Sequence, residues 1–160
     1  MVVAKLPHDR QAFTQGLSIE EDQLYESTGL YGQSRLRKLD ISTGQILQKQ
    51  LVSPKLFGEG LAVFPHQIIQ ITWKEQRALI YERHSLKPWR SLFYLGEGWG
   101  LCREGNTLWM SNGTATLVQR ELQNFAVLKK LSVHLKGQPV IYLNDLECDG
   151  YHLYANIWQQ

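Results

Sequence analysis

The side chains in this sequence with the best combination of type and position for chemistry are one carboxylate, two carboxamides and three indoles. They are Glu59, Gln15, Asn144, Trp73, Trp99 and Trp158. A carboxyl group among indoles loses hydration, which raises its pKa and suits it to carry a proton near neutral pH. Carboxamide and indole N–H groups can donate hydrogen bonds to a substrate. These residue types predict a proton-transfer site in which Glu59 is the acid/base.

Each of these residues also has a structural interpretation. Glu59 stands between two glycines, as in a solvated turn, and the same tripeptide recurs around Glu97. Tryptophans often pack in a core, which we expect for Trp89 and Trp109, and carboxamides often cap strand ends. The functional interpretation therefore depends on a fold that brings the six residues together. We assign Glu97 a structural role because it lies two positions before the nearest candidate, Trp99.

A repeat supplies the elements that would position these side chains. Short segments rich in Val, Ile, Leu, Tyr and Trp alternate with Gly, Asn, Asp and Pro, which predicts many short strands and no long helix. Four hairpin-like units recur about every 40–45 residues, a period typical of β-propeller blades. Each unit carries an equivalent leucine, at Leu17, Leu61, Leu101 and Leu146. The alternative is a β-sandwich whose hairpins resemble one another by chance.

The two ends of each hairpin should lie side by side. We call the residue before the first strand the leading residue and the residue after the second strand the closing residue. The leading residues are Gln15, Glu59, Trp99 and Asn144, and the closing residues are Gly29, Trp73, Gly113 and Trp158. If the hairpins surround an axis as innermost strands, all eight positions fall at one mouth of the central channel.

Composition excludes several classes of protein. A length of 160 residues favours one domain, and 17 basic against 15 acidic residues gives no basic surplus for binding nucleic acid. No apolar run approaches the ~20 residues that span a bilayer, so we expect no membrane association. The N-terminus lacks the apolar core of a signal peptide, which predicts a cytoplasmic chain.

The cysteines and histidines show no metal-binding pattern. Cys102 and Cys148 share no short spacing, so we expect two buried, reduced thiols. The five histidines are scattered and form no HExxH pattern. We therefore expect no metal at the site.

Six segments in colinear order resemble the glutaminyl-peptide cyclotransferases of the plant and bacterial type. They are Ala12-Phe13-Thr14-Gln15-Gly16-Leu17, Tyr25-Glu26-Ser27-Thr28-Gly29, Phe57-Gly58-Glu59-Gly60-Leu61, Gly98-Trp99-Gly100-Leu101, Leu143-Asn144-Asp145-Leu146 and Tyr154-Ala155-Asn156-Ile157-Trp158. The resemblance implies an all-β fold of the five-bladed β-propeller family, of which this chain would cover about three and a half blades. It also implies a metal-independent acyltransferase, with no cofactor, that converts the N-terminal glutamine of peptides or proteins to pyroglutamate and releases ammonia.

The resemblance assigns roles to eight residues. Glu59 falls on the catalytic position, and the substrate-binding positions fall on Phe13, Gln15, Phe57, Trp73, Trp99, Asn144 and Trp158. Asp145 stands where the family usually has Glu. The family is often secreted or periplasmic, which leaves the localisation open.

The resemblance also predicts a single propeller domain over residues 1–160 that is incomplete at its C-terminus. The fourth blade would be cut, and the fifth, which carries a lysine of the family's pocket, would be absent. Two expectations follow: self-association through open blade edges, and uncertain activity of the 160 residues alone. The alternative function is a non-catalytic, truncated propeller that acts as a peptide-binding or interaction module.

Overall fold

The computed structural model describes residues 5–159, which form strands, turns and loops. The first sheet consists of β1 (Thr14–Glu20), β2 (Gln23–Thr28), β3 (Arg35–Asp40) and β4 (Ile46–Leu51), paired in that order. The second consists of β5 (Gly58–Val63), β6 (Gln67–Thr72), β7 (Arg77–Glu82) and β8 (Pro88–Phe93). The third consists of β9 (Leu101–Glu104), β10 (Thr107–Met110), β11 (Thr116–Glu121) and β12 (Val127–Ser132).

Two small antiparallel sheets complete the described chain. They are the hairpin of β13 (His134–Leu135) and β14 (Gln138–Pro139), and the pair of β15 (Leu143–Cys148) and β16 (Leu153–Ile157). Every strand pair in the structure is antiparallel. None of the described residues forms a helix long and apolar enough to cross a membrane.

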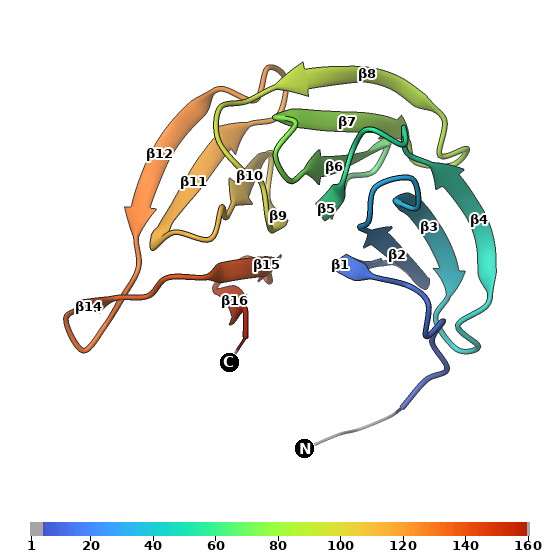
Figure 1. Ribbon diagram of the computed structural model, residues 1–160, viewed down its shortest axis with the longest axis horizontal. Helices are drawn as coiled ribbons and strands as arrows, with labels where there is room; N and C mark the ends of the chain where they lie inside the picture. The colour runs from blue at the N-terminus through green and yellow to red at the C-terminus, as the bar shows by residue number, and fades with distance from the viewer. Residues whose placement is uncertain (1–4, 160) are drawn as a thin grey trace.

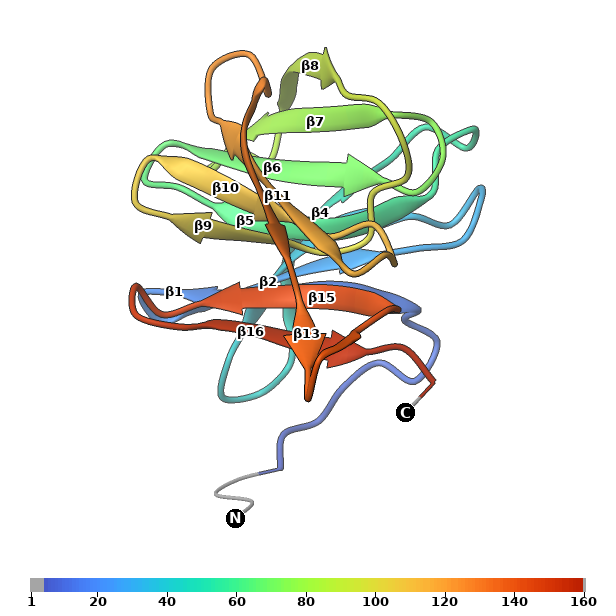
Figure 2. The same ribbon diagram turned by 90° about the vertical axis from the view of Figure 1, so that its left-hand side faces the viewer.

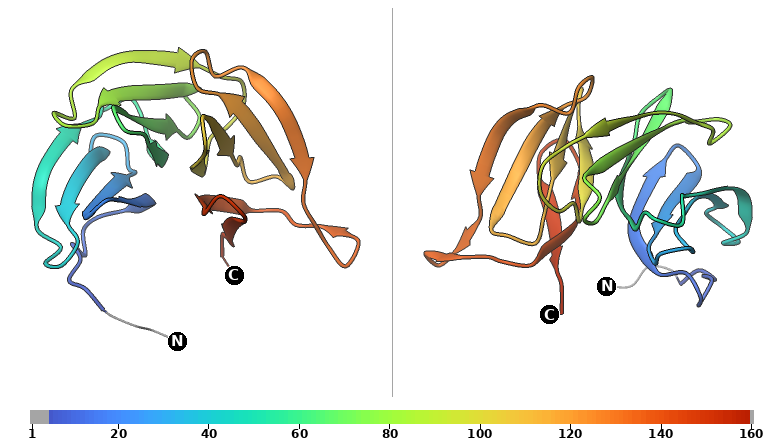
Figure 3. Two further views of the ribbon diagram at one scale, coloured as in Figure 1. Left: turned by 180° about the vertical axis from the view of Figure 1, so that it is seen from behind. Right: turned by 45° about the horizontal axis from the view of Figure 1, so that its top comes forward.

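The sheets stand around a common centre, as blades do in a propeller. Figure 1 shows β1, β5, β9 and β15 innermost and β4, β8 and β12 on the periphery. The view from behind shows the same arc, open between the first blade and the β15–β16 pair (Figure 3). The predicted all-β propeller architecture is confirmed, and the radial arrangement excludes a two-layer sandwich.

Glycines allow the innermost strands to approach one another closely. A Cβ atom on Gly60 would lie 2.5 Å from the backbone nitrogen of Leu101, and one on Gly100 would collide with the carbonyl oxygen of Asn144. Any side chain at either position would push two blades apart. In the fourth unit this position holds Asp145 in place of glycine. β15 and β1 lie side by side (Figure 2).

Apolar side chains fill the space between adjacent sheets. The second and third sheets share the largest cluster, which includes Ile69, Leu101 and Phe125. Trp109 packs in the cluster between the third sheet and the β15–β16 pair, as predicted. The prediction for Trp89 is wrong, because its side chain is 59% exposed. Trp89 lies on β8, an outermost strand that no further sheet covers.

Cys102 and Cys148 form a disulfide, so the prediction of reduced thiols is wrong. They lie on β9 and β15, the innermost strands of neighbouring blades, and their Cα atoms are 5.6 Å apart. That distance suits a disulfide. Their sequence separation of 46 residues is about one repeat, so the repeat places them on equivalent strands. A search for short cysteine spacings cannot detect such a pair.

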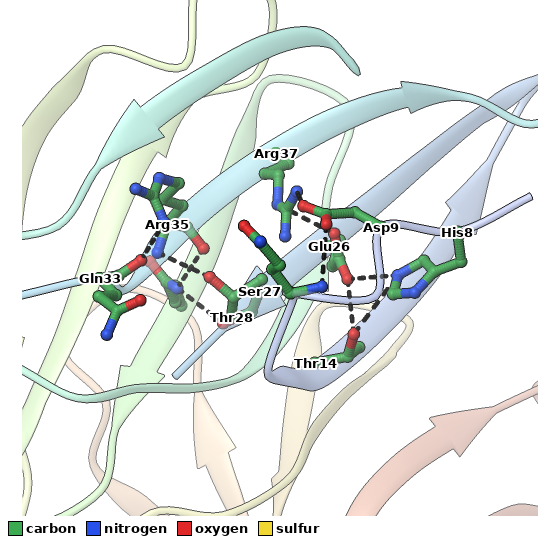
Figure 4. Close-up of polar contacts among 11 residues, drawn as sticks. His8, Asp9, Thr14, Glu26, Ser27, Thr28, Gln33, Arg35 and Arg37 are labelled. Carbon is green, nitrogen blue, oxygen red and sulfur yellow. Dashed lines mark hydrogen bonds and ion pairs between the residues drawn. The ribbon is translucent and has the colours of Figure 1, made fainter. Parts of the chain in front are cut away.

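A polar cluster fastens the segment before β1 to the first sheet (Figure 4). Glu26 on β2 is fully buried, and one carboxylate oxygen contacts His8 Nε2 at 2.8 Å and accepts a hydrogen bond from Thr14 Oγ1 at 2.6 Å. The other oxygen lies 3.1 Å from Arg37 Nε, and Arg37 also binds Asp9 at 2.8 Å. These contacts hold residues 8–14 against β2 and β3.

Candidate active site

The structure brings the eight predicted site residues to one pocket of about 230 Å³. Its lining consists of Phe13, Gln15, Phe57, Glu59, Trp73, Trp99, Asn144 and Trp158. Five of the eight are aromatic, so the pocket is mainly apolar with a few polar groups, as small-molecule sites usually are. The pocket lies at the hairpin ends, where the repeat places the leading and closing residues.

Backbone hydrogen bonds explain why the hairpin ends meet there. In three units the closing residue donates its N–H to the carbonyl of the residue two positions before the leading residue. The bonds join Gly29 to Phe13 (2.8 Å), Trp73 to Phe57 (3.0 Å) and Trp158 to Tyr142 (2.9 Å). Each bond places an aromatic residue beside a closing residue, so the repeat itself assembles an aromatic rim.

The closing positions without an indole are glycines for a steric reason. A Cβ atom on Gly29 would collide with the ring of Phe57, and one on Gly113 would lie 2.7 Å from the ring of Trp99. The backbone of Gly113 also has a φ of +78°, which glycine adopts without strain. Each glycine thus makes room for a pocket aromatic residue.

The aromatic side chains form two groups on the pocket wall. Phe57 contacts Phe13 and Trp73 edge-on, with ring centroids 6.2 and 5.5 Å apart. Trp99 and Trp158 form a second edge-on pair at 5.8 Å. These geometries are the ones that aromatic pairs prefer. Such walls exclude water from the groups between them.

Glu59 has a strongly perturbed carboxyl group. It lies on β5, is 5% exposed, and accepts a hydrogen bond from Gln15 Nε2 at 3.1 Å. Burial raises its pKa to about 9, and the neighbouring Asp145 carboxylate adds to the rise. The bond from Gln15 opposes the rise, while Glu97 adds a smaller increase. At neutral pH Glu59 therefore holds a proton in the empty pocket.

Glu97 contacts two pocket residues, which the sequence interpretation did not foresee. Its Oε2 accepts hydrogen bonds from Trp73 Nε1 at 2.8 Å and from Trp99 Nε1 at 3.0 Å. These two indole N–H groups therefore serve Glu97 and not a ligand. The sequence does contain a signal for Glu97. It stands two positions before a leading residue, where the other three units have an aromatic residue.

A second carboxylate, that of Glu75, supports the aromatic group around Phe57. Glu75 accepts a hydrogen bond from Tyr31 Oη at 2.7 Å and one from the backbone N–H of Phe57 at 3.2 Å. The Tyr31 ring packs edge-on against Phe57 at 5.5 Å, and its bond to Glu75 raises its pKa to about 12. Lys74 Nζ lies 3.8 Å from the ring centroid of Trp73. No repeat position marks these residues.

The pocket is equipped for acid/base chemistry on a ligand the size of one residue. A buried carboxyl group with a raised pKa can donate a proton, and the carboxamides of Gln15 and Asn144 can donate or accept hydrogen bonds. Within residues 5–159 no three His, Cys, Asp or Glu side chains are placed to hold a metal ion.

Comparisons with known proteins identify relatives. The chain is 40% identical over 162 residues to the glutaminyl-peptide cyclotransferase of Arabidopsis thaliana, an alignment that covers 99% of this chain and 50% of that protein. The chain thus spans about half the length of this curated relative. The crystal structure of Myxococcus xanthus glutaminyl cyclase matches with a TM-score of 0.91 and 35% identity, covering 100% of this chain and 68% of that one.

A more distant structure supports the fold alone. The WD40 repeats of RRP9 match with a TM-score of 0.62 and 11% identity, covering 87% of this chain and 43% of that one. WD40 repeats form β-propellers. The family model described as glutamine cyclotransferase matches residues 1–160, and so the chain belongs to the glutamine cyclotransferase family.

Proposed function

We propose that this chain carries the catalytic pocket of a glutaminyl-peptide cyclotransferase. The reaction closes the N-terminal glutamine of a peptide or protein into pyroglutamate and releases ammonia. The observation that carries the proposal is the buried Glu59 carboxyl, with a pKa of about 9, among aromatic walls and beside Gln15. Membership of the glutamine cyclotransferase family supports the same reaction.

The reaction needs a proton transfer between two nitrogens of the substrate. The substrate α-amine attacks its own γ-carbonyl carbon, one C–N bond forms, and the C–N bond to the leaving nitrogen breaks. Protonated Glu59 donates its proton to the leaving nitrogen. The resulting carboxylate accepts a proton from the attacking nitrogen, so that ammonia leaves and Glu59 regains its starting state.

The remaining pocket residues serve proximity and charge stabilisation. An extended glutamine keeps its amine away from its carboxamide, so a pocket that holds it folded accelerates ring closure. The aromatic walls, formed by Phe13, Phe57, Trp73, Trp99 and Trp158, supply that constraint. Gln15 and Asn144 also line the pocket, and in this proposal their amide groups donate N–H groups to the carbonyl oxygen as it gains negative charge.

Ammonia release from a Gln-initiated dipeptide tests the proposal on the 160-residue chain. We expect release from this peptide, none from its N-acetylated form, and no change on adding a chelator. The acetylated peptide is the matched control because it lacks only the attacking amine. Peptide binding without ammonia release would reject the enzymatic proposal and favour the peptide-binding alternative.

A further inference from the structure

The residue two positions before each leading residue is aromatic in three of the four units and acidic in one. Phe13, Phe57 and Tyr142 are the aromatic residues, and Glu97 is the exception. The aromatic three lie beside the closing residue of their own unit. Glu97 cannot extend the aromatic rim, so its carboxylate must have another role at this place.

Glu97 joins the two aromatic groups of the pocket wall. Trp73 belongs to the Phe57 group and Trp99 to the Trp158 group, and both indoles donate to the same oxygen of Glu97. The bonds measure 2.8 and 3.0 Å, as expected for good charge-assisted hydrogen bonds.

The backbone around Glu97 is fixed as well. The N–H of Gly98 donates to the carbonyl of Trp73 at 2.9 Å, and a Cβ atom on Gly98 would lie 2.9 Å from the carbonyl oxygen of Thr72. Gly98 therefore fits closely against the end of β6. The residue that follows Glu97 is therefore held against the second blade.

We propose that Glu97 is a positioning residue, which holds the indoles of Trp73 and Trp99 in the orientation that folds the substrate glutamine for ring closure. The proposal rests on the proposed cyclotransferase function. By taking both N–H groups, Glu97 also makes the two rings present apolar faces to the ligand. The orientation of these rings matters because ring closure depends on holding the substrate amine against its own carbonyl group.

The first test needs no catalytic activity. The chain has five tryptophans, each with one indole N–H resonance in a ¹H–¹⁵N spectrum. Glu97→Gln should move the resonances of Trp73 and Trp99, because a neutral amide accepts more weakly than a carboxylate. Glu104→Gln is the matched control, since Glu104 accepts from Trp109 Nε1 at 2.9 Å outside the pocket. It should move the Trp109 resonance alone.

The second test is kinetic. Glu97→Gln should lower kcat for a Gln-initiated dipeptide by about tenfold or more, whereas Glu104→Gln should leave kcat unchanged. Glu97→Asp keeps the charge but shortens the side chain, so it should not restore kcat. Recovery by Asp would show that Glu97 acts through charge on Glu59, and that result would overturn the positioning role.

Two further outcomes separate this proposal from the function on which it rests. Unmoved Trp73 and Trp99 resonances in Glu97→Gln, or an unchanged kcat, would overturn the role of Glu97 alone. Absence of ammonia release by the unsubstituted chain would overturn the proposed function, and it would be seen before any substitution is made.

Discussion

Glu59 owes its raised pKa first to burial and then to charged neighbours that come from other blades. Asp145 from β15 and Glu97 from the loop before β9 add negative charge around the buried carboxyl group. Gln15 from β1 offers the one hydrogen bond that favours the ionised form. The pKa of about 9 is therefore a property of the assembled mouth and not of the Gly58-Glu59-Gly60 tripeptide.

Replacing Glu59 by its isosteric amide tests its role in catalysis. Glu59→Gln keeps the shape of the pocket but removes the proton that moves between the two substrate nitrogens. We expect ammonia release from a Gln-initiated dipeptide to fall at least about 100-fold, the usual contribution of a general acid/base. Calorimetric affinity for the peptide should change only a few-fold. Ordinary turnover by this variant would remove Glu59 from the mechanism.

The same substitution should stabilise the fold at alkaline pH. Glu59 has an unfolded pKa of about 4.3, but in the folded chain its pKa is raised to about 9. Both states are protonated at low pH, and as the pH rises only the unfolded state ionises. Folding stability is therefore lost progressively up to the folded pKa.

Glu59→Gln removes this loss. The variant should melt higher than the unsubstituted chain, and the difference in melting temperature should grow from pH 5 to pH 9. We expect it to grow by at least ~2–4 °C, which corresponds to ~1 kcal/mol for a chain of this size. Thermal unfolding followed by circular dichroism measures the difference. A constant difference across this range would contradict the raised pKa.

The sequence predicts which residues line the pocket better than it predicts which residues hold those side chains in place. Gln15, Glu59 and Trp73 occupy repeated positions, so the period alone places them together. The hydrogen bonds from Trp73 to Glu97 and from Tyr31 to Glu75 depend on how far particular side chains reach across a blade boundary. Periodicity carries no information about that reach.

At the scale of the elements, the innermost strands carry the site, and a disulfide joins two of them. The Cys102–Cys148 bond links β9 to β15, whose leading residues Trp99 and Asn144 both line the pocket. The strands were predictable because their residues alternate with turn signals at a regular period. The disulfide was predictable only from the repeat register, because its two cysteines are far apart in sequence.

Reducing this disulfide should destabilise the chain. A cross-link that closes a loop of 46 residues restricts the unfolded state and contributes about 4 kcal/mol by loop entropy. We expect the melting temperature to fall when a strong reductant is added. The double variant Cys102→Ser/Cys148→Ser is the control, since it should melt low with or without reductant. A reductant effect of equal size in both proteins would contradict the link.

Disulfides are typical of oxidising compartments, which argues against the cytoplasmic location expected from the N-terminus.

At the scale of the whole molecule, the blades form an arc with one open side. The first and last of the innermost strands, β1 and β15, lie next to this side. The repeat period predicts the radial order of the sheets, because each unit can bury its faces only against its neighbours. The period cannot predict how closely β15 approaches β1, because Asp145 on β15 stands where the other units have glycine.

The open side exposes apolar residues along a groove between β1 and the β15–β16 pair. Leu17 and Tyr154 line this groove, and they are 42% and 54% exposed. Ile19 lies on the same face of β1 as Leu17, because alternate residues of a strand share a face, and it is 59% exposed. β16 is hydrogen-bonded only to β15 in the described chain. Exposed apolar faces and free strand edges are sites of association.

We therefore predict that the 160-residue chain self-associates through this side. Size-exclusion chromatography with light scattering should show a mass that rises with protein concentration. The double variant Leu17→Lys/Ile19→Lys should shift the chain toward monomer, because two charges on β1 oppose burial of that face. Phe93→Lys is the matched control, since Phe93 is 65% exposed on β8, at the periphery. It should leave the association unchanged, and a monomer at every concentration, or equal loss of association in both variants, would show that the open side is not the contact.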